Sequence, residues 1–464
     1  MGLSIRFKTI LLAAVVVSGF SGSAFSETLS EALIAAYREN PTLDAARAAL
    51  RATDEGVPQA LSGWRPTITA QGSASHVIDD KDSTNNLLVN DHIYTATNNA
   101  DYNITLSQPL FRGFKTVEGT AAAEANVKSG RQQLLATEQS VLFNAAQAYI
   151  DTLRDRRILQ LRQSNVNILQ GQLRATNERF KAGELTKTDT AQSQASLAGA
   201  QAAMATAVAA VRADEASYQQ FIGHKPNKLA PAPLAKAPPT LDASLQIAHE
   251  TNPNILAAAQ NIDVAEHTVN VVFGDLLPSA SLNGRFDSYH NLSGVTGFNA
   301  APLSDQSFTV QGLVTVPLYE AGLTYSRVRQ AKENVSQSKL KAIDAVRTVR
   351  QGVASAWARL VAARESVAAD LTQLSASQLA LNGVRQEYAV GSRSTIDILN
   401  AEALLLNAQI ALVSAQHDQL LGSYQLQAAM GHLTAQHLRL GTLYNPKEHY
   451  NDVRNKWLGL NAED

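Results

Sequence analysis

Residues 179–189 run Arg-Phe-Lys-Ala-Gly-Glu-Leu-Thr-Lys-Thr-Asp, and residues 387–397 run Glu-Tyr-Ala-Val-Gly-Ser-Arg-Ser-Thr-Ile-Asp. The two stretches align without a gap at an offset of 208, which pairs Phe180 with Tyr388, Gly183 with Gly391 and Asp189 with Asp397. Glycine supplies the left-handed backbone that ends a helix, and Thr or Ser followed by an acidic residue caps the next helix. The same turn between two helices is therefore predicted twice, at Gly183 and at Gly391.

The duplication extends over nearly the whole chain. At an offset of 212, matching residues in the two copies are Thr28 and Thr240, Asn40-Pro41 and Asn252-Pro253, and Pro66 and Pro278. Further along the offset falls to 208, as in Pro109-Leu-Phe and Pro317-Leu-Tyr. One unit is thus used twice, and the second copy is four residues shorter between its strands.

Prolines are absent from two long windows, 110–225 and 318–445, which hold 116 and 128 residues. Because prolines mark many turns in globular chains, such windows indicate long helices. In the first copy we expect one helix from Phe114 to about Phe180, which is 67 residues. At about 1.5 Å per residue this helix is roughly 100 Å long.

Each long helix is expected to pair with a shorter helix that returns along it. The sequence predicts these helical hairpins over residues 113–222 and 320–432. In the second hairpin the expected seam residues are spaced 4, 3, 4 and 3 apart, and they are Val367, Leu371, Leu374, Gln378 and Leu381. This spacing is typical of a coiled coil, and an ordinary core stripe is the alternative.

A pair of β-strands precedes each hairpin. Apolar and polar residues alternate with a period of two, as where the apolar residues Tyr102, Ile104 and Leu106 are each followed by a polar one. The predicted strands are about ten residues long, enough for a tilted strand to cross a bilayer, and span 66–76, 101–111, 278–288 and 306–318.

The connections within the strand pairs, about 77–101 and 288–306, are rich in Asp, Asn, Ser and Gly. The cluster Asp79-Asp-Lys-Asp82 could indicate a calcium loop. Its spacing lacks the order of acidic and glycine residues that such loops need, so a solvated external loop is the favoured interpretation.

Residues 1–26 resemble an export signal. Arg6 and Lys8 precede the apolar run Ile10 to Val17, and Ala24-Phe-Ser26 forms a cleavage site before Glu27. The alternative is a retained membrane anchor, but the run is about half of the ~20 residues that a spanning helix needs. We expect no later segment to form a transmembrane helix, so the mature protein should be either soluble outside the cytoplasm or inserted as β-strands.

The copies are joined by a proline-rich stretch and followed by a polar tail. Residues 224–239 contain five prolines and are expected to form a stiff extended linker. The predicted organisation is a first repeat over 27–223, a second over 240–440 and a tail over 441–464.

Composition excludes several classes of protein. The 464 residues include no cysteine, so disulfides, thiolate metal sites and a cysteine nucleophile are ruled out. The 39 basic and 41 acidic side chains give a formal charge of −2, which argues against nucleic-acid binding. No P-loop, dinucleotide or Gly-x-Ser-x-Gly motif occurs, and no histidine pair has i, i+4 spacing, since His432 and His437 miss it by one residue. Neither an enzymatic reaction nor a cofactor or metal is predicted.

Four amphipathic strands cannot close a barrel, because open sheet edges are not tolerated in lipid and the smallest barrels have eight strands. If these strands span a membrane, the chain must form an oligomer. Two chains would supply eight strands and three would supply twelve.

The sequence resembles the TolC-like outer-membrane efflux protein family. The matching features are the duplicated Asn-Pro motifs at Asn40 and Asn252, the Pro-Leu-[Phe/Tyr] motifs, and both hairpin turns. The tail Leu443 to Trp457 resembles alphaproteobacterial members, and the absence of cysteine separates the chain from lipidated ones. The resemblance implies a mainly α fold with membrane β-barrel strands, in which a homotrimer shares a 12-stranded barrel that continues into an α-helical periplasmic tunnel.

The same resemblance implies roles for residues near the hairpin turns. Asp189, Tyr388 and Arg393 are expected to form a latch between neighbouring hairpins that holds the periplasmic end closed. Asp397 is expected to form an acidic ring at the constriction, and Asn400 replaces a second ring one turn later, which should weaken cation selectivity. The alternative for both aspartates is a structural role as helix caps.

We therefore expect a passive exit duct in the outer membrane with a long periplasmic portion. It would export drugs, dyes and bile salts with a periplasmic adaptor and an inner-membrane RND or ABC transporter. Type I protein secretion is an alternative with the same architecture. A soluble periplasmic coiled-coil adaptor or scaffold is an alternative of another class.

Overall fold

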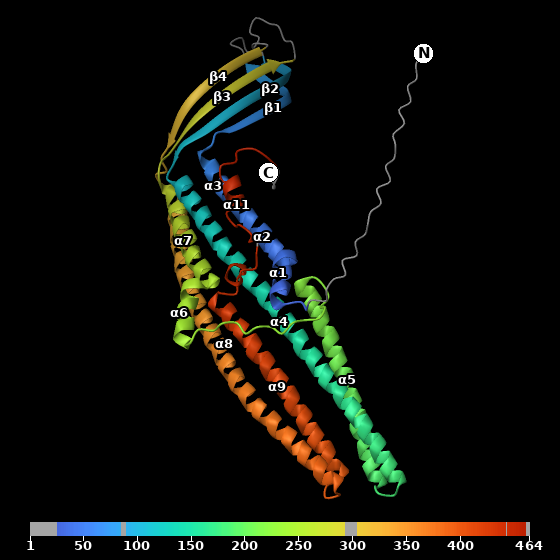
Figure 1. Cartoon of the computed structure of the whole chain (residues 1–464). Coiled ribbons are helices and arrows are strands. Elements are labelled where there is room, and N and C mark those ends of the chain that lie inside the picture. Colours follow the sequence, from blue (N-terminus) through green and yellow to red (C-terminus); the bar gives the residue numbers. More distant parts are fainter. Residues whose placement is uncertain (1–25, 85–89, 293–303, 442, 461–464) are drawn as a thin grey trace, which may run out of the picture.

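The computed structural model describes residues 26–84, 90–292, 304–441 and 443–460. The predicted export signal lies outside these residues except for Ser26. The molecule is elongated, with a sheet at one end, two long helical hairpins at the other, and short helices, the linker and the C-terminal segment between them (Figure 1).

The two hairpins are built from helices of identical length. The long helices, α4 (Lys115–Lys181) and α8 (Leu323–Ala389), have 67 residues each. The returning helices, α5 (Lys187–Ile222) and α9 (Thr395–Met430), have 36 residues each. Matching helices of the two copies begin and end 208 positions apart, so the duplication found in the sequence is a duplication of structure.

Short helices precede each strand pair. In the first copy they are α1 (Leu29–Glu39), α2 (Pro41–Asp54), α3 (Gly56–Leu61) and the 3₁₀ turn η1 (Ser62–Trp64). In the second they are α6 (Leu241–Thr251), α7 (Pro253–Phe273) and η2 (Gly274–Leu276). Pro58 in the first copy removes a backbone donor, whereas α7 continues through the matching position, Asn270, without a break.

The Asn-Pro motifs have the same structural role in both copies. Asn40 caps α2 by accepting a hydrogen bond from Thr42 N at 3.0 Å, and its amide donates to Phe221 O at 3.1 Å. Asn252 caps α7 by accepting from Asn254 N at 3.0 Å, and its amide donates to Ala429 O at 2.9 Å. Each asparagine therefore joins a short helix to the end of the returning helix of its own copy.

The four strands form one antiparallel sheet in the order β1-β2-β3-β4. They are β1 (Thr67–Thr84), β2 (Asn90–Arg112), β3 (Ser279–Asn291) and β4 (Ser304–Thr315). Pairing of β2 with β3 joins the two copies. The external loop expected at about 77–101 is too long. The ladder between β1 and β2 continues out to Thr84 and Asn90, so Asp79 to Asp82 lie in a strand.

Proline limits the pairing at the base of the sheet. Pro109 lies inside β2, where the register with β3 shifts between Pro109 and Phe111. Such a bulge accommodates a residue that cannot donate to the ladder. In the second copy, β4 ends at Thr315, two residues before Pro317.

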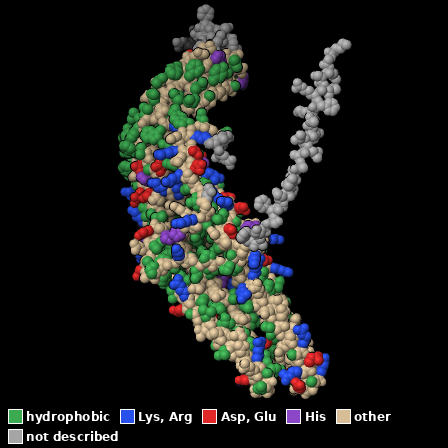
Figure 2. All heavy atoms as spheres, in the orientation of Figure 1, with side chains coloured by type: hydrophobic (Ala, Val, Ile, Leu, Met, Phe, Trp, Pro, Cys, Tyr) green, Lys and Arg blue, Asp and Glu red, His purple; other side chains and the backbone are tan. Residues whose placement is uncertain are grey.

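One face of the sheet carries exposed apolar side chains. Ile104 lies opposite Phe286, and Phe286 lies opposite Phe308, which forms an apolar row across three strands. All three side chains are exposed, and Figure 2 shows hydrophobic side chains gathered over the convex side of the sheet. Within this chain the outer edges of β1 and β4 have no strand partner among the described residues.

The main core lies where α1 and α2 pack on α4, near the end of α5. Tyr149 of α4 and Tyr218 of α5 are fully buried there. The Tyr149 hydroxyl lies 2.8 Å from Glu27 O and 2.6 Å from Ala230 O. This tyrosine therefore fixes both the N-terminal segment and the linker against the middle of the first hairpin.

The seam predicted for the second hairpin has the right period but partly the wrong residues. Leu371 is 50% exposed and Gln378 is also exposed. The buried and half-buried positions of α8 in this region are Ala363, Val367, Asp370, Leu374, Ser377 and Leu381. The 4, 3 spacing of a coiled coil is kept, with small or polar residues at alternate positions.

Helix α9 departs from the expectation that no later segment approaches a transmembrane helix. Its most apolar window has a mean hydropathy of 1.5, which makes it a candidate span by length and composition alone. In the structure α9 packs along α8 as the returning helix of the second hairpin (Figure 1). Of its most apolar window, 28% is buried inside this chain.

Candidate functional site: the hairpin tips and the junction between hairpins

Both hairpin turns end their long helix in the same way. Gly183 and Gly391 have φ of +82° and +81°, a left-handed conformation that favours glycine. Glu184 N donates to Arg179 O at 2.9 Å, and Ser392 N donates to Glu387 O at the same distance. These bonds are those of a Schellman motif, so the predicted turns are present at the far ends of the hairpins.

Both aspartates cap the returning helix. The backbone N of Thr186 donates to Asp189 Oδ2 at 2.9 Å, and the backbone N of Ser394 donates to Asp397 Oδ2 at 2.9 Å. The Thr186 and Ser394 hydroxyls donate to the same oxygens at 2.6 and 2.7 Å. These hydrogen bonds lower the pKa of both carboxyls, so both aspartates are charged at neutral pH.

Tyr388 forms one of the contacts between the two hairpin tips. The guanidinium of Arg179, on α4, lies 5.0 Å from the centre of the Tyr388 ring on α8. Arg179 also forms an ion pair with Glu184 at 2.9 Å, and this bond raises the pKa of its guanidinium. A cation over an aromatic ring is attractive, so this contact holds the tips together within one chain.

Arg393 forms an ion pair on its own hairpin. Its Nε lies 2.7 Å from Glu387 Oε2, and this bond raises the pKa of the guanidinium. Among the described residues no hydrogen bond or ion pair joins Asp189, Tyr388 and Arg393 to one another. The three expected latch residues thus lie at the tips. There Asp189 contacts Thr186 and, on the other hairpin, Thr395, Tyr388 contacts Arg179, and Arg393 pairs with Glu387.

The two residues expected at the constriction lie one turn apart near the start of α9. Asp397 is half-buried and Asn400 is exposed. Positions three apart on a helix lie on the same side, so both side chains can face one direction. Figure 2 shows charged side chains gathered at the tip of the α4–α5 hairpin.

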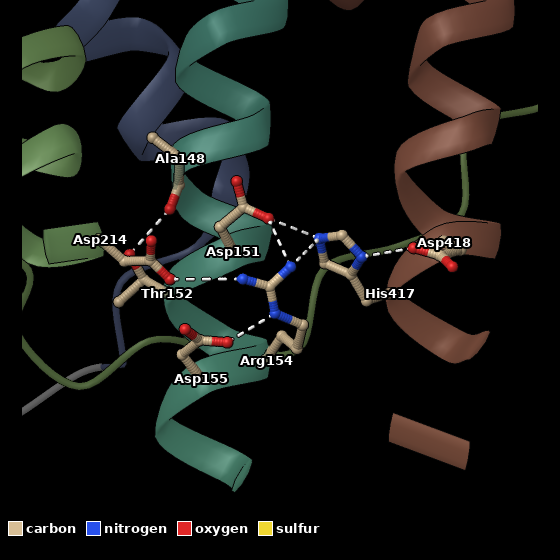
Figure 3. Close-up of polar contacts among 8 residues, drawn as sticks. All are labelled: Ala148, Asp151, Thr152, Arg154, Asp155, Asp214, His417 and Asp418. Carbon is tan, nitrogen blue, oxygen red and sulfur yellow. Dashed lines mark hydrogen bonds and ion pairs between the residues drawn. The ribbon is translucent and has the colours of Figure 1, made fainter. Parts of the chain in front are cut away.

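A second polar site, which was not predicted, lies midway along the hairpins. Arg154 on α4 forms ion pairs with Asp155 at 2.6 Å, with Asp151 at 3.2 Å and with Asp214 of α5 at 3.7 Å. Figure 3 shows its guanidinium at the centre of these carboxylates. One arginine therefore joins the two helices of the first hairpin.

His417 extends this network to the second hairpin. The ring is buried on α9, with Nε2 2.6 Å from Asp151 and Nδ1 2.9 Å from Asp418 (Figure 3). Burial lowers the pKa of this imidazole, but the two carboxylates outweigh burial and raise it overall. His417 thus bridges α4 and α9, and the two carboxylates favour its charged form.

The network contains more acid than base. Asp151, Asp155, Asp214 and Asp418 surround two basic groups, Arg154 and His417. Asp214 Oδ2 is buried and has no hydrogen-bond partner among the described residues. Burial, followed by repulsion from Asp155 and Asp151, raises the pKa of Asp214 to about 6.

A pocket of about 580 Å³ lies beside the network, between α4, α9 and the linker. Its wall is largely apolar and includes Ile150, Leu153, Leu412 and Pro231, while Arg157 and His417 are polar. The two hairpins are therefore not tightly packed at this level, and the contact of His417 with Asp151 joins them beside the pocket.

The two C-terminal histidines that miss helical spacing nevertheless meet. The rings of His432 and His437 are stacked with centres 4.5 Å apart. Burial and the neighbouring imidazole lower the pKa of His432. No cluster of three or more potential metal ligands occurs in the part of the chain that the structure describes.

Comparison with known proteins bears on this duplicated architecture. The model of a family described as "Outer membrane efflux protein" matches residues 33–224 and 244–432. The chain belongs to this family. The two matched segments correspond to the two copies of the repeat, so each copy of this efflux protein is recognised separately.

Relatives of this efflux protein match it along most of its length. It is 39% identical over 463 residues to the outer membrane efflux protein BepC of Brucella suis biovar 1 (strain 1330), which covers 98% of each protein. It is 25% identical over 442 residues to the outer membrane protein TolC of Escherichia coli (strain K12), which covers 92% of this chain and 87% of TolC.

Solved structures show the same fold. The Campylobacter jejuni CmeC outer membrane channel aligns with a TM-score of 0.76 at 16% identity, over 98% of both chains. A structure of CusC aligns with a TM-score of 0.75 at 18% identity, over 88% of this chain and 92% of CusC. The expected fold class, helical hairpins that continue from barrel strands, is thus confirmed.

The family assignment fixes location and general function. The protein is an outer-membrane exit duct of a tripartite efflux system, with a helical tunnel in the periplasm, and it is not an enzyme. Ducts of this family are trimers that act with an adaptor and an inner-membrane pump. The alternative of a soluble periplasmic scaffold is therefore wrong.

The raised pKa of Asp214 predicts a pH dependence of stability. Its folded-state pKa of about 6 exceeds the unfolded value of 3.8. Between these two pH values Asp214 is therefore protonated in the native state and ionised in the unfolded state. The contribution of the protonated Asp214 carboxyl to the free energy of unfolding is full below about pH 4 and is lost as pH rises through about 6. Asp214→Asn should raise the free energy of unfolding by roughly 1–2 kcal/mol near pH 8 and change it little near pH 4.

Thermal unfolding midpoints at the two pH values would measure this effect. The matched control is Asp418→Asn, which removes an exposed acid of the same network. A lower midpoint for Asp214→Asn near pH 8 would show instead that this carboxylate is a net favourable partner of Arg154.

Proposed function

We propose that this duct exports toxic small molecules such as drugs, dyes and bile salts. The observation that carries the proposal is the 39% identity, over 98% of both chains, to a protein named as an efflux protein. Relatives named for protein secretion are less similar, for example AprF of Pseudomonas aeruginosa at 24% over 73% of this chain.

Type I protein secretion is the second candidate. Its support is that AprF, CyaE of Bordetella pertussis and PrtF of Dickeya chrysanthemi are 23–26% identical to this chain, and the names of AprF and PrtF refer to protease secretion. Efflux and secretion can use the same duct, because the energy comes from the inner-membrane partner. An RND transporter would suit the first function and an ABC transporter the second.

We propose that the exposed hairpin tips dock a periplasmic adaptor and form the gate. In a trimer the tips converge on one axis, so each inner side chain occurs three times there. The proposed latch uses Asp189, Tyr388 and Arg393 between neighbouring hairpins, and the contact of Arg179 with Tyr388 supports it because it already joins two hairpin tips. Asp397 forms the proposed constriction ring, and Asn400 leaves the position one turn later uncharged.

The repeat boundaries, 27–223 and 240–440, and removal of residues 1–26 as an export signal are also proposals. The family match to 33–224 and 244–432 supports the boundaries. The tail over 441–464 follows the second repeat.

The substrate proposal predicts the phenotype of a deletion strain. Loss of the gene should increase sensitivity to bile salts and dyes, and growth at graded concentrations of these compounds measures it. Secreted proteins in the culture medium should be unchanged. Normal resistance with loss of one or more secreted proteins would favour type I secretion instead.

The proposed latch predicts a change in conductance. Tyr388→Phe combined with Arg393→Ser should raise single-channel conductance in planar bilayers, because it weakens the contacts that hold the tips closed. Lys181→Ser is a matched control, since Lys181 is an exposed tip cation paired with Glu178 on its own helix. Conductance that stays at the level of this control would count against the latch.

The proposed ring predicts a change in ion selectivity. Asn400→Asp adds three carboxylates around the axis of a trimer, so cation selectivity and block by multivalent cations should both increase. Reversal potentials in a salt gradient and titration with a trivalent cation measure these effects. Asn382→Asp adds the same charge at an exposed position on α8, and an equal response from both variants would contradict a specific ring at Asn400.

A further inference from the structure

One side of α9 carries a seam of residues that meets the first hairpin. The seam positions are spaced 4, 3, 4, 3 and 4 apart, and they are Thr395, Leu399, Glu402, Leu406, Gln409 and Val413. Thr395 contacts Asp189 at the tip, and Leu399 packs in a small apolar core with residues of α4 and α5. Leu406 and the two positions after it line pockets between α9 and the first hairpin. This seam is therefore the surface through which α9 contacts the other hairpin.

Glu402 is the charged residue among these six positions. Its side chain is only 8% exposed. The Oε1 atom accepts a hydrogen bond from Nη2 of Arg385, on α8, at 3.2 Å. The Oε2 atom is buried and has no hydrogen-bond partner among the described residues. A buried carboxylate with one unpaired oxygen is costly in its charged form, because it has lost water without gaining a full set of partners.

The surroundings of Glu402 offer few charges. It lines a pocket of about 250 Å³ whose walls are α9 on one side and α4 and α5 on the other. The charged groups that face it from neighbouring helices are Arg385 of α8 and Arg162 of α4, which lines the same pocket. On α9 itself, Asp397 lies five residues earlier and caps the helix. The α5 residues of the wall are uncharged, and they are Ser196, Gly199, Ala200 and Ala203. Movement of α9 away from the first hairpin would open this pocket to water.

The protonation state of Glu402 is linked to this packing. Burial raises its pKa above the ordinary value of 4.5, and the bond from Arg385 opposes burial only in part. A carboxyl whose pKa is higher in the packed arrangement than in water stabilises that arrangement when it is protonated. This contribution is full below about pH 4.5 and is lost as pH rises through the raised pKa.

We propose that Glu402 is a proton-sensitive lock between the two hairpins. Its neutral carboxyl keeps α9 packed on the first hairpin, and its ionisation favours separation of the hairpins next to the tips. Separation would then open the duct, a step that rests on the gate proposed at the tips. At an offset of 208 the first copy has Gln194, which is exposed and uncharged. The buried acid thus belongs to the contact between the hairpins and not to the repeated unit.

Labelling of an introduced thiol tests the lock. The chain has no cysteine, so Ala200→Cys gives each chain a single thiol. Ala200 is 8% exposed and lies in the same apolar core as Leu399, so its reaction with a maleimide in the purified trimer reports separation of the hairpins. Rates are compared at equal pH with and without Glu402→Gln, which cancels the effect of pH on the thiol itself. At pH 8 the chain that retains Glu402 should react roughly 5-fold faster or more, the change in an opening equilibrium that one unpaired buried polar group produces. The difference should shrink as pH falls to 5.

Glu178→Gln is the matched control, because Glu178 is exposed and pairs with Lys181 on its own helix. This control should leave the labelling rate unchanged. If Ala200→Cys does not assemble, Ala203→Cys places the thiol at a half-buried position of the same pocket wall. Equal rates with and without Glu402→Gln at pH 8, or a faster rate with Glu402→Gln, would overturn the lock.

Single-channel conductance of the same variants separates the lock from the gate. Between pH 5 and pH 8 the conductance of the wild-type trimer should rise more than that of Glu402→Gln. A difference in labelling without any difference in conductance would support the lock and contradict the gate at the tips.

Discussion

Unpaired backbone groups in lipid are the constraint on which the rest of this structure depends. The sheet ends at β1 and β4, and a lipid bilayer offers no hydrogen bonds to the outer edges of these strands. The chain must therefore close its sheet with other copies of itself, and three copies supply twelve strands. Every long helix continues from a strand or leads back to one, so closure of the barrel also arranges the hairpins around a common axis.

Duplication gives each chain two strand pairs and two hairpins from one repeated unit. Both copies have helices of 67 and 36 residues and the same Asn-Pro cap that joins a short helix to the end of a returning helix. The copies differ at the tips, where Phe180 and Leu185 in one correspond to Tyr388 and Arg393 in the other. A ring of alternating, unequal hairpins can have specific contacts between unlike neighbours, and the pairing of Arg179 with Tyr388 is one such contact.

Midway along the hairpins, charged groups join helices in addition to the apolar contacts between them. Arg154 and His417 connect α4, α5 and α9 beside an open pocket. Charged contacts between helices can be rearranged with less loss of packing than interlocked apolar side chains. This region can therefore hold two hairpins together while allowing them to shift, as the gate proposed at the hairpin tips would require.

The sequence by itself determined the duplicated unit, the long hairpins, both turns and the caps. Each of these depends on local chemistry: glycine at positive φ, Asn before Pro, and the period of apolar residues. Tertiary structure alone decided that Leu371 is exposed and that β1 continues to Thr84 while β2 begins already at Asn90. It also decided that Asp151, Arg154 and His417 meet. These features depend on contacts between residues up to 266 positions apart, and no local pattern specifies which side chains will face one another.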